Sequence, residues 1–390
     1  MKNISDVAIR PTWIEIDLDA VTNNVNEWKR ILGEKILITA AIKGSGIGHG
    51  LVPVAKHLIS MGISYFFMGN IYEAIKLRKE GIKSNIALFG NTLPEAAKYY
   101  ADYNLMPSFT DRNDPKDYMK VLGENTPLKI WIKVETGLGR FGVDIDQVID
   151  MVKEIQESTP YKIEGIYSHI GGRAQKSSVE SDAYCENQWQ IFKKLKEDIE
   201  SLGINIPYYE IASTYPIIVM PHTWLNCVCI GTGFFKNEGM DKPKLEINIK
   251  PAFHALKSKL VSLNKHKAGD QIGGYLLERD SLIGVIPIGL ADGLSGKNKD
   301  KEVLVNGVRC PIRGGVSFEH TRVDVTDSPG VQKGDEVVII GKQGNDEITP
   351  EEVCKRTGQS WYQLVSSFNP MFVPHIYLKN GEVWDTEIAY

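Results

Sequence analysis

Eight strand-like segments alternate with helix-like segments in the first part of the chain, and this alternation limits the possible folds more than any other feature. Several of the strand candidates are continuous apolar runs, as expected of parallel strands buried on both faces. No Gly-x-Gly-x-x-Gly follows the first of them, which favours a closed (β/α)8 TIM barrel over an open dinucleotide-binding sheet. The strand candidates are residues 36–43, 64–69, 85–89, 105–108, 128–134, 162–168, 207–212 and 226–231.

The segments between these strands have helical spacing. Asp19 is predicted to cap a first helix that ends at Gly33. The longest helix has a single apolar stripe that includes Trp189 and Phe192. Beyond the first helix, helices are expected at about 51–61, 71–80, 93–102, 112–122, 145–158 and 182–202.

The pattern changes after a charged, breaker-rich linker at 236–244. Short strands then dominate, including a hairpin around Asn306-Gly307. The α/β barrel is therefore expected to be followed by a C-terminal β-rich domain. We predict a barrel domain at 10–240 and a β domain at 245–390, with the first strand a candidate to pack on the β domain.

Composition excludes several classes of function. The chain has 390 residues, a formal net charge of −4 and 42% hydrophobic residues, which gives no electrostatic argument for a nucleic-acid or acidic-membrane partner. No apolar stretch approaches the roughly 18 residues of a membrane helix and no signal peptide is recognisable, so a cytoplasmic location is expected. Cys227 and Cys229 lack a second pair at zinc spacing, so buried strand thiols are favoured and no metal site is expected.

Lys43 is the strongest functional candidate. It stands where the first apolar run stops and a glycine cluster at 44–50 begins. A lysine at the carboxyl end of a barrel strand faces the mouth, where catalytic groups gather, and its amine can form a Schiff base. The alternative is an ordinary surface lysine at a strand end, so further residues are needed to support the functional reading.

Further candidates follow later strands. Arg140 follows the fifth, His169 the sixth and Ser213 the seventh, while Gly231-Thr232-Gly233 follows the eighth. Barrel enzymes frequently hold a phosphate between the last two strands. A Schiff-base lysine that faces a phosphate pocket indicates a site for pyridoxal 5′-phosphate.

With these motifs the chain resembles the alanine racemase family from about Arg10 to Tyr377. The resemblance implies a fold-type III pyridoxal-phosphate enzyme, with an N-terminal barrel and a C-terminal β domain. It also implies a head-to-tail homodimer whose sites include β-domain residues of the partner. The segments that carry the resemblance are Ile14–Ala20, Ala41–Gly50, Lys133–Arg140, Ile288–Gly293 and Val323–Thr326.

The resemblance also implies roles for individual residues. Lys43 would hold the cofactor as a Schiff base and move a proton at the substrate Cα. Arg140 would bond the cofactor phenolic oxygen, and Lys133 matches a lysine that is carbamylated in some relatives. His169 matches a histidine near the cofactor ring. The phosphate-binding positions correspond to Ser213, Gly231, Thr232 and Tyr377.

The chain departs from the family at several positions of the active site. Relatives use a second acid/base tyrosine. The matching segment of this chain, residues 269–280, is shorter, and Tyr275 is its only tyrosine. Tyr275 is therefore either catalytic or a packed strand tyrosine. Cys229 stands where relatives aim an arginine at the pyridine nitrogen, and a thiol carries no fixed charge.

The substrate end departs as well. Ile47 replaces a phosphate-contacting tyrosine, and Leu290 replaces another tyrosine. The family's carboxylate-binding stretch is changed, so a substrate other than alanine is expected. The four residues now in that stretch are Ser317, Phe318, Glu319 and His320.

The leading hypothesis is a pyridoxal-phosphate-dependent racemase or epimerase for an amino acid other than alanine. Lys43 would serve one face of the substrate, and Tyr275, or Glu319 or His320 of the partner subunit, the other. One alternative is a decarboxylase or lyase of the same fold type. A second is a cofactor-binding protein with little turnover.

Overall fold

A computed structural model of the chain describes residues 8–90, 92–171, 179–236, 243–297 and 301–387. The chain forms two compact units. The first, called the barrel unit, consists of Thr22–Gly46 and Val54–Lys250. The second, called the β unit, consists of the chain up to Val21, the segment Ile47–Pro53 and the chain from Pro251 onward. Most of the predicted linker, residues 237–242, lies outside the described residues.

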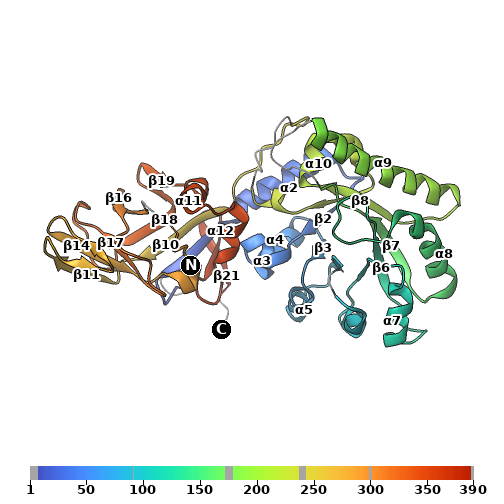
Figure 1. Ribbon diagram of the computed structural model, residues 1–390, viewed down its shortest axis with the longest axis horizontal. Coiled ribbons are helices and arrows are strands. Elements are labelled where there is room, and N and C mark those ends of the chain that lie inside the picture. The colour runs from blue at the N-terminus through green and yellow to red at the C-terminus, as the bar shows by residue number, and fades with distance from the viewer. Residues whose placement is uncertain (1–7, 91, 172–178, 237–242, 298–300, 388–390) are drawn as a thin grey trace. The chain divides into compact units, whose positions relative to one another are not determined.

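Eight parallel strands form the barrel (Figure 1). They are hydrogen-bonded in the order β4-β3-β2-β9-β8-β7-β6-β5. The ring closes where Ala87 pairs with Met106 just before β5, with a Leu88 N–H to Met106 carbonyl distance of 2.8 Å. The strands are β2 (Leu37–Ala41), β3 (Tyr65–Met68), β4 (Asn85–Leu88), β5 (Ser108–Phe109), β6 (Lys129–Lys133), β7 (Lys162–Tyr167), β8 (Tyr208–Ser213) and β9 (Cys227–Ile230).

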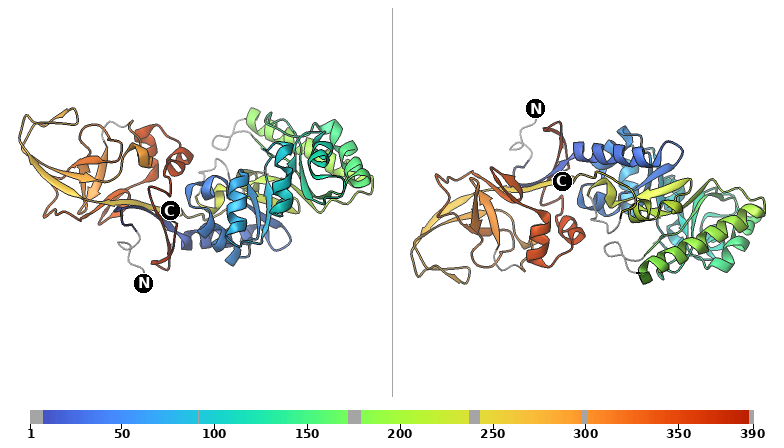
Figure 2. Two further views of the ribbon diagram at one scale, coloured as in Figure 1. Left: turned by 90° about the horizontal axis from the view of Figure 1, so that it is seen from below. Right: turned by 90° about the horizontal axis from the view of Figure 1, so that it is seen from above.

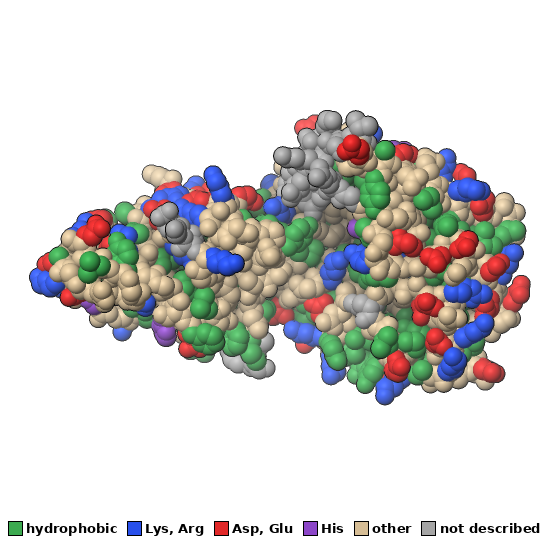
Figure 3. Space-filling view, viewed as in Figure 1, with side chains coloured by type: hydrophobic (Ala, Val, Ile, Leu, Met, Phe, Trp, Pro, Cys, Tyr) green, Lys and Arg blue, Asp and Glu red, His purple; other side chains and the backbone are tan. Residues whose placement is uncertain are grey.

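Helices lie outside the strands of the barrel (Figures 1 and 2). In α8 (Val148–Ser158), the buried Val148, Met151, Val152 and Ile155 follow helical spacing and face the sheet. Acidic and basic side chains are mixed over the visible outer face of the barrel helices (Figure 3). The other helices around the barrel are α2 (Leu18–Leu32), α4 (Val52–Ser60), α5 (Ile71–Lys79), α6 (Ala97–Asp102), α7 (Asp114–Leu122), α9 (Val179–Ser201) and α10 (Thr214–Val219).

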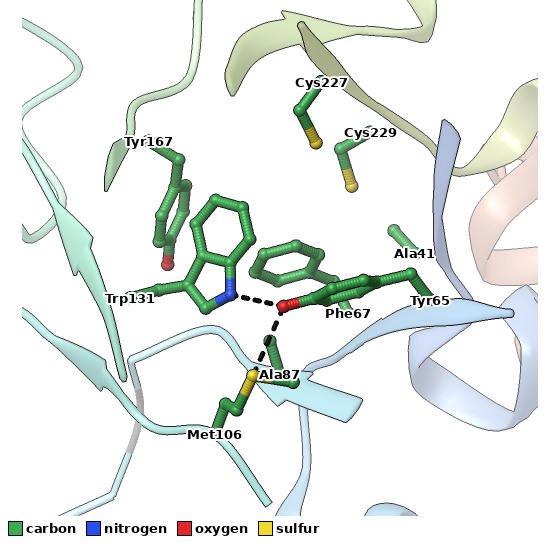
Figure 4. Close-up of a cluster of buried hydrophobic side chains, with 9 residues drawn as sticks. All are labelled: Ala41, Tyr65, Phe67, Ala87, Met106, Trp131, Tyr167, Cys227 and Cys229. Atoms are coloured by element: carbon green, nitrogen blue, oxygen red, sulfur yellow. Dashed lines mark hydrogen bonds between the residues drawn. The ribbon is translucent and has the colours of Figure 1, made fainter. Parts of the chain in front are cut away.

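Large aromatic side chains fill the interior of the barrel (Figure 4). The Tyr65 hydroxyl accepts a hydrogen bond from Trp131 Nε1 at 2.8 Å and donates to Met106 Sδ at 3.3 Å. Cys227 and Cys229 of β9 are buried in the same cluster, as predicted for strand thiols. The barrel is therefore a packed core below its mouth.

The β unit is built mainly on one mixed sheet of eight strands, whose main path runs β16-β15-β18-β10-β1-β20-β21. Its first strand, β1 (Thr12–Asp17), lies between β10 (Phe253–Lys259) and β20 (His375–Lys379). The other members are β15 (Glu302–Val305), β16 (Val308–Pro311), β18 (Glu336–Gln343), β19 (Asp346–Ile348) and β21 (Glu382–Glu387).

Two smaller sheets and two helices complete the β unit. One sheet joins β11 (Ser262–His266), β14 (Ser281–Ile286) and β17 (Thr321–Asp324), and the other is the hairpin of β12 (Gln271–Ile272) and β13 (Tyr275–Leu276). The helices are α11 (Pro350–Thr357) and α12 (Trp361–Ser367). The predicted barrel followed by a β-rich domain is confirmed.

Two local predictions need correction or sharpening. The residue that caps α2 is Asp17, whose carboxylate accepts the N–H groups of Asp19 and Ala20 at 2.8 and 3.0 Å. Asp19 lies inside the first turn, so the prediction that it caps the helix was wrong. The predicted Asn306-Gly307 turn is present, with φ of 50° and 77°, which is the left-handed pair that a type I′ hairpin turn requires.

Candidate active site

Lys43 begins a turn of left-handed helix, α3 (Lys43–Gly48). The five residues after it all have positive φ, between 53° and 76°, and the Gly46 N–H bonds the Ile42 carbonyl at 3.0 Å. This conformation costs a residue with a Cβ roughly 1–2 kcal/mol, so Ser45 and Ile47 are strained. The three glycines that alternate with them adopt it without that penalty. Glu73 of α5 holds the turn by accepting the Gly44 N–H at 3.2 Å and the Ser45 N–H.

The Lys43 amine lies at the mouth of the barrel. The residue is exposed, yet the surrounding protein atoms lower the pKa of its amine by desolvation, and Arg140 contributes to the lowering. Its Nζ lies 5.1 Å from the centre of the Phe89 ring. A Cβ added at Gly69 would lie 3.1 Å from the Lys43 Cβ, so the missing side chain leaves room for the lysine stem. A lowered pKa increases the fraction of neutral, nucleophilic amine at neutral pH.

Lys133, the second amine of the mouth, is almost fully buried at the end of β6. Its Nζ donates to the Val134 carbonyl at 2.6 Å and to the Ser168 hydroxyl at 3.3 Å. Burial lowers its pKa to about 8, against the opposing attraction of Glu135 and Glu210. A substantial neutral fraction near pH 8 is what reaction with carbon dioxide would require, but carbamylation of Lys133 stays a prediction.

Arg140 and His169 lie close enough to both amines to influence them. Burial lowers the pKa of His169 to about 4. The positive charges of Arg140, Lys133 and Lys43 add to this lowering. Arg140 is exposed, and its backbone N–H lies 3.3 Å from the Glu135 carboxylate. The mouth therefore combines the guanidinium of Arg140 with two amines and an imidazole whose pKa values are all lowered.

The ends of β8 and β9 form a cluster of hydroxyl and N–H groups. Ser213 pairs in register with Cys229, and Gly231 and Thr232 follow directly after β9. The Thr214 hydroxyl lies 3.3 and 3.4 Å from the N–H groups of Gly231 and Gly233. Thr214 was not predicted, although its position beside Ser213 at a strand end was a usable signal.

A buried carboxyl group was also missed. Glu210 of β8 is 3% exposed and pairs in register with Cys227. Burial raises the pKa of Glu210 well above its usual range, although Lys133 opposes this shift. The pKa of the Cys229 thiol is raised by burial and then by Glu210, so it carries no charge at neutral pH. An acidic residue within a buried strand was the one signal in the sequence, and Glu164 of β7 carries the same signal.

In the β unit, Tyr377 lies on β20 and is fully buried. Its hydroxyl donates to the Glu387 carboxylate at 3.1 Å, and that carboxylate also accepts the Leu51 N–H at 3.2 Å. A Cβ at Gly50 would lie 1.6 Å from the Tyr377 oxygen, so only glycine fits beside it. Burial and Glu387 raise the pKa of Tyr377, which keeps the phenol protonated. Its role toward a phosphate stays a prediction.

Tyr275 lies on β13 and is half-buried against a cluster that includes Ile272 and Leu277. The Arg313 guanidinium lies 4.8 Å from the centre of its ring. A phenol needs a cationic neighbour to act as a base at neutral pH, and Arg313 is such a neighbour. Packing and a catalytic role are both compatible with this geometry.

The predicted substrate stretch is an exposed loop before β17. Its backbone is fixed, because the Ser317 and Phe318 carbonyls accept the N–H groups of Leu290 and Ala291 at 3.0 and 2.8 Å. The Phe318 side chain is 70% exposed, and Glu319 and His320 are exposed as well. The loop therefore has an ordered backbone and outward-facing side chains.

The barrel-unit residues fit a pyridoxal phosphate group. An amine with a lowered pKa, Lys43, has room beside Gly69 to carry an aldehyde adduct. Hydroxyl and N–H donors suitable for a phosphate lie at the ends of β8 and β9. Arg140 supplies a cation on the same mouth. We therefore regard this mouth as a lysine-centred active site of a barrel enzyme.

Comparison with known proteins agrees with this class. The sequence matches the family descriptions "Alanine racemase, N-terminal domain" over residues 16–238 and "Alanine racemase, C-terminal domain" over residues 253–377. An alanine racemase of Caldanaerobacter subterraneus subsp. tengcongensis is 33% identical over 379 residues, which cover 96% of both chains.

Solved structures give the same result. An alanine racemase from Bacillus anthracis, with bound L-Ala-P, has a TM-score of 0.86, 26% identity and coverage of 97% of each chain. A histidine racemase from Leuconostoc mesenteroides subsp. sake has a TM-score of 0.85 and 27% identity over 95% of this chain and 99% of its own. The chain belongs to the alanine racemase family. It is an isomerase of the racemase class.

Proposed function

We propose that the protein is a pyridoxal-phosphate-dependent racemase or epimerase that acts on an amino acid other than alanine. The observation that carries the proposal is the Lys43 amine, which lies at the mouth of a closed barrel with a lowered pKa and with Arg140 and His169 nearby. Pyridoxal phosphate, when bound, withdraws electrons from the substrate Cα and so acidifies its proton.

The chain's own residues have separate tasks in this proposal. Lys43 binds the cofactor and moves the proton at Cα on one face. Arg140 bonds the phenolic oxygen, and His169 and Cys229 line the ring. The phosphate is held by Ser213, Gly231, Thr232 and Tyr377. None of the helices among the described residues is long and apolar enough to cross a membrane.

Tyr275 is our candidate for the acid/base of the opposite face. It is half-buried on a short hairpin, which limits its motion, and Arg313 lies over its ring. A second group is required because a racemase must deliver a proton to the face opposite the one from which it was taken. Glu319 and His320 of the partner subunit are the alternatives.

The substrate assignment depends on the departures at the substrate end. The loop presents Phe318, a carboxylate and an imidazole, and Leu290 beside it is 46% exposed. These side chains differ in size and charge from those of the family pattern. The similar histidine racemase supports the view that this fold accepts a side chain larger than a methyl group.

A homodimer is part of the proposal. The Arg10 side chain donates to the Phe372 and Glu319 carbonyls, each at 3.3 Å. These contacts bring together three segments of the β unit that carry exposed apolar side chains. Ile9, Phe318 and Phe372 are 81%, 70% and 43% exposed. Exposed apolar side chains grouped in this way are typical of an interaction surface.

The experiment is a screen in deuterated water. The holoprotein is incubated separately with each L-amino acid, including alanine, and followed by NMR and polarimetry. We expect deuterium at Cα with loss of optical rotation for at least one amino acid, and a weaker effect with alanine. Release of carbon dioxide would indicate a decarboxylase instead, and no reaction with any amino acid would contradict the proposal.

A further inference from the structure

Glu210 is a buried carboxyl group that has no role in the proposed function so far described. Three neighbouring strands place it in the barrel interior, because Tyr167 of β7 pairs in register with Glu210 and Glu210 with Cys227 of β9. Residues directly in register on parallel strands point to the same side of the sheet. Tyr167 and Cys227 both point into the barrel (Figure 4), so Glu210 does too.

The carboxyl group of Glu210 is buried. Among the residues that the structure describes, none forms a hydrogen bond or an ion pair with it. Lys133, the nearest candidate cation, donates instead to the Val134 carbonyl and the Ser168 hydroxyl. Burial makes a carboxyl group in this position costly to ionise, and the charge of Lys133 offsets only part of that cost.

Glu210 also lies beside the position from which the family reaches the cofactor ring. Cys229 stands in the place of the arginine that relatives aim at the pyridine nitrogen, and Glu210 adds to the burial that keeps its thiol neutral. Without the arginine, no fixed charge faces that nitrogen from β9. Burial raises the pKa of the Glu210 carboxyl group, so that this group can donate a proton, and a pyridine nitrogen is a basic acceptor.

We propose that Glu210 is the partner of the cofactor's ring nitrogen in this protein, in place of the family's arginine. On binding, the carboxyl proton passes to the nitrogen, which leaves a carboxylate hydrogen-bonded to a ring N–H⁺. The number of protons and the total charge of the pair are unchanged by this transfer. A protonated ring withdraws electrons more strongly than a neutral one, so Glu210 would increase the acidity of the substrate Cα.

The inference rests on the proposed function, because it requires pyridoxal phosphate on Lys43. The experiment uses pyridoxal phosphate labelled with ¹⁵N in the ring, bound to wild type, Glu210→Gln and Glu164→Gln. Glu164 is the matched control, because it is a buried carboxylate on the neighbouring β7 that is already paired with Lys129 at 3.2 Å. The ¹⁵N signal reports whether the ring nitrogen carries a proton.

We expect the protonated signal in wild type and Glu164→Gln and the unprotonated signal in Glu210→Gln. We also expect Glu210→Gln to bind pyridoxal phosphate about 10- to 100-fold more weakly, since it loses a charge-assisted hydrogen bond. An unprotonated ring in wild type, or a protonated ring in Glu210→Gln, would overturn the inference. If Glu210→Gln does not fold, the wild-type signal between about pH 6 and pH 9 decides alone, because the inference requires a protonated ring throughout.

Borohydride reduction of the same wild-type sample separates the two levels of the proposal. A reduced adduct on Lys43 with an unprotonated ring leaves the proposed function intact and removes the role of Glu210. Absence of an adduct removes the proposed function and this inference with it.

Discussion

The barrel mouth has nearly buried charged groups beside its exposed Lys43 and Arg140, whereas the loop at 317–320 of the β unit exposes three of its four candidates. In the barrel, Lys133 and Glu210 are 1% and 3% exposed, and charges there act mainly on one another. In the loop, Phe318 is 70% exposed, and hydrogen bonds to the loop backbone hold it in place. In the homodimer that we propose, the barrel groups would serve their own subunit and the loop would meet a second surface. A variant in the barrel therefore tests buried electrostatics, whereas a variant in the loop tests an exposed surface.

Replacing Lys43 in the barrel is expected to lower the rate of racemisation more than any other change. Lys43→Ala removes both the covalent anchor and the proton carrier, so we expect racemisation to fall by about 10³-fold or more. The measurement is the rate of optical inversion of the substrate found in the amino-acid screen. Lys129→Ala, on the exposed start of β6, is the matched control and should retain the wild-type rate. Racemisation by Lys43→Ala at the wild-type rate would remove the barrel mouth from the chemistry.

Tyr275→Phe tests the β unit in the same assay. If Tyr275 is the second acid/base, we expect a loss of about 10²- to 10⁴-fold in kcat with the fold unchanged. Tyr362→Phe, another half-exposed tyrosine of the β unit, should have no effect. A rate for Tyr275→Phe within twofold of wild type would identify it as a packing residue, and Glu319 and His320 would be tested next.

Mixing these two inactive variants sharpens the comparison further. If each site combines the barrel of one subunit with the β unit of the other, a Lys43→Ala/Tyr275→Phe heterodimer contains one complete site. Random mixing should then restore about a quarter of the wild-type activity. No recovery after verified subunit exchange would contradict shared sites.

A change in packing at the phosphate end should have a moderate effect. A Cβ at Gly233 would lie 2.5 Å from the Trp28 ring and 2.8 Å from the Thr214 methyl group. We expect Gly233→Ala to lower the free energy of unfolding by about 1–3 kcal/mol and to weaken binding of pyridoxal phosphate. Gly315→Ala, where a Cβ meets nothing within 4 Å, is the control for urea titrations of both variants. Equal stability of the two variants would show that this strand end can relax.

The buried amine of Lys133 predicts a small effect of pH on the free energy of unfolding. Its pKa is about 8 in the folded protein and near 10.5 when unfolded, so the unfolded state binds more protons between these values. Stability should therefore rise with pH across this window, and the cost of burying the charge is complete below pH 8. Lys133→Met should flatten the rise by on the order of 1–3 kcal/mol in urea titrations.

Lys301 of the β unit provides the matched comparison for Lys133. Its pKa is also lowered to about 8 by burial, and Lys301→Met should flatten the same window. Only Lys133→Met should also change activity, since Lys301 lies outside the candidate site. An unchanged pH profile in both variants would mean that neither amine is buried as described.

The sequence was sufficient to predict the barrel because its strands are apolar runs that can only be buried. It also located Lys43 and His169 just after strands, and Arg140 in the loop that follows β6. The left-handed turn after Lys43 could not be predicted, since a glycine cluster indicates a sharp turn but not its hand, and Ile47 disfavours it. Glu210 was missed because the sequence does not reveal which charged strand residue points inward.

The central claim is a covalent bond between Lys43 and pyridoxal phosphate, and borohydride reduction with peptide mapping tests it most directly. The account predicts a single reduced pyridoxyl group on the peptide that contains Lys43, and its loss when the amine is absent. A label on another lysine, or no label on holoprotein prepared with excess cofactor, would contradict the account.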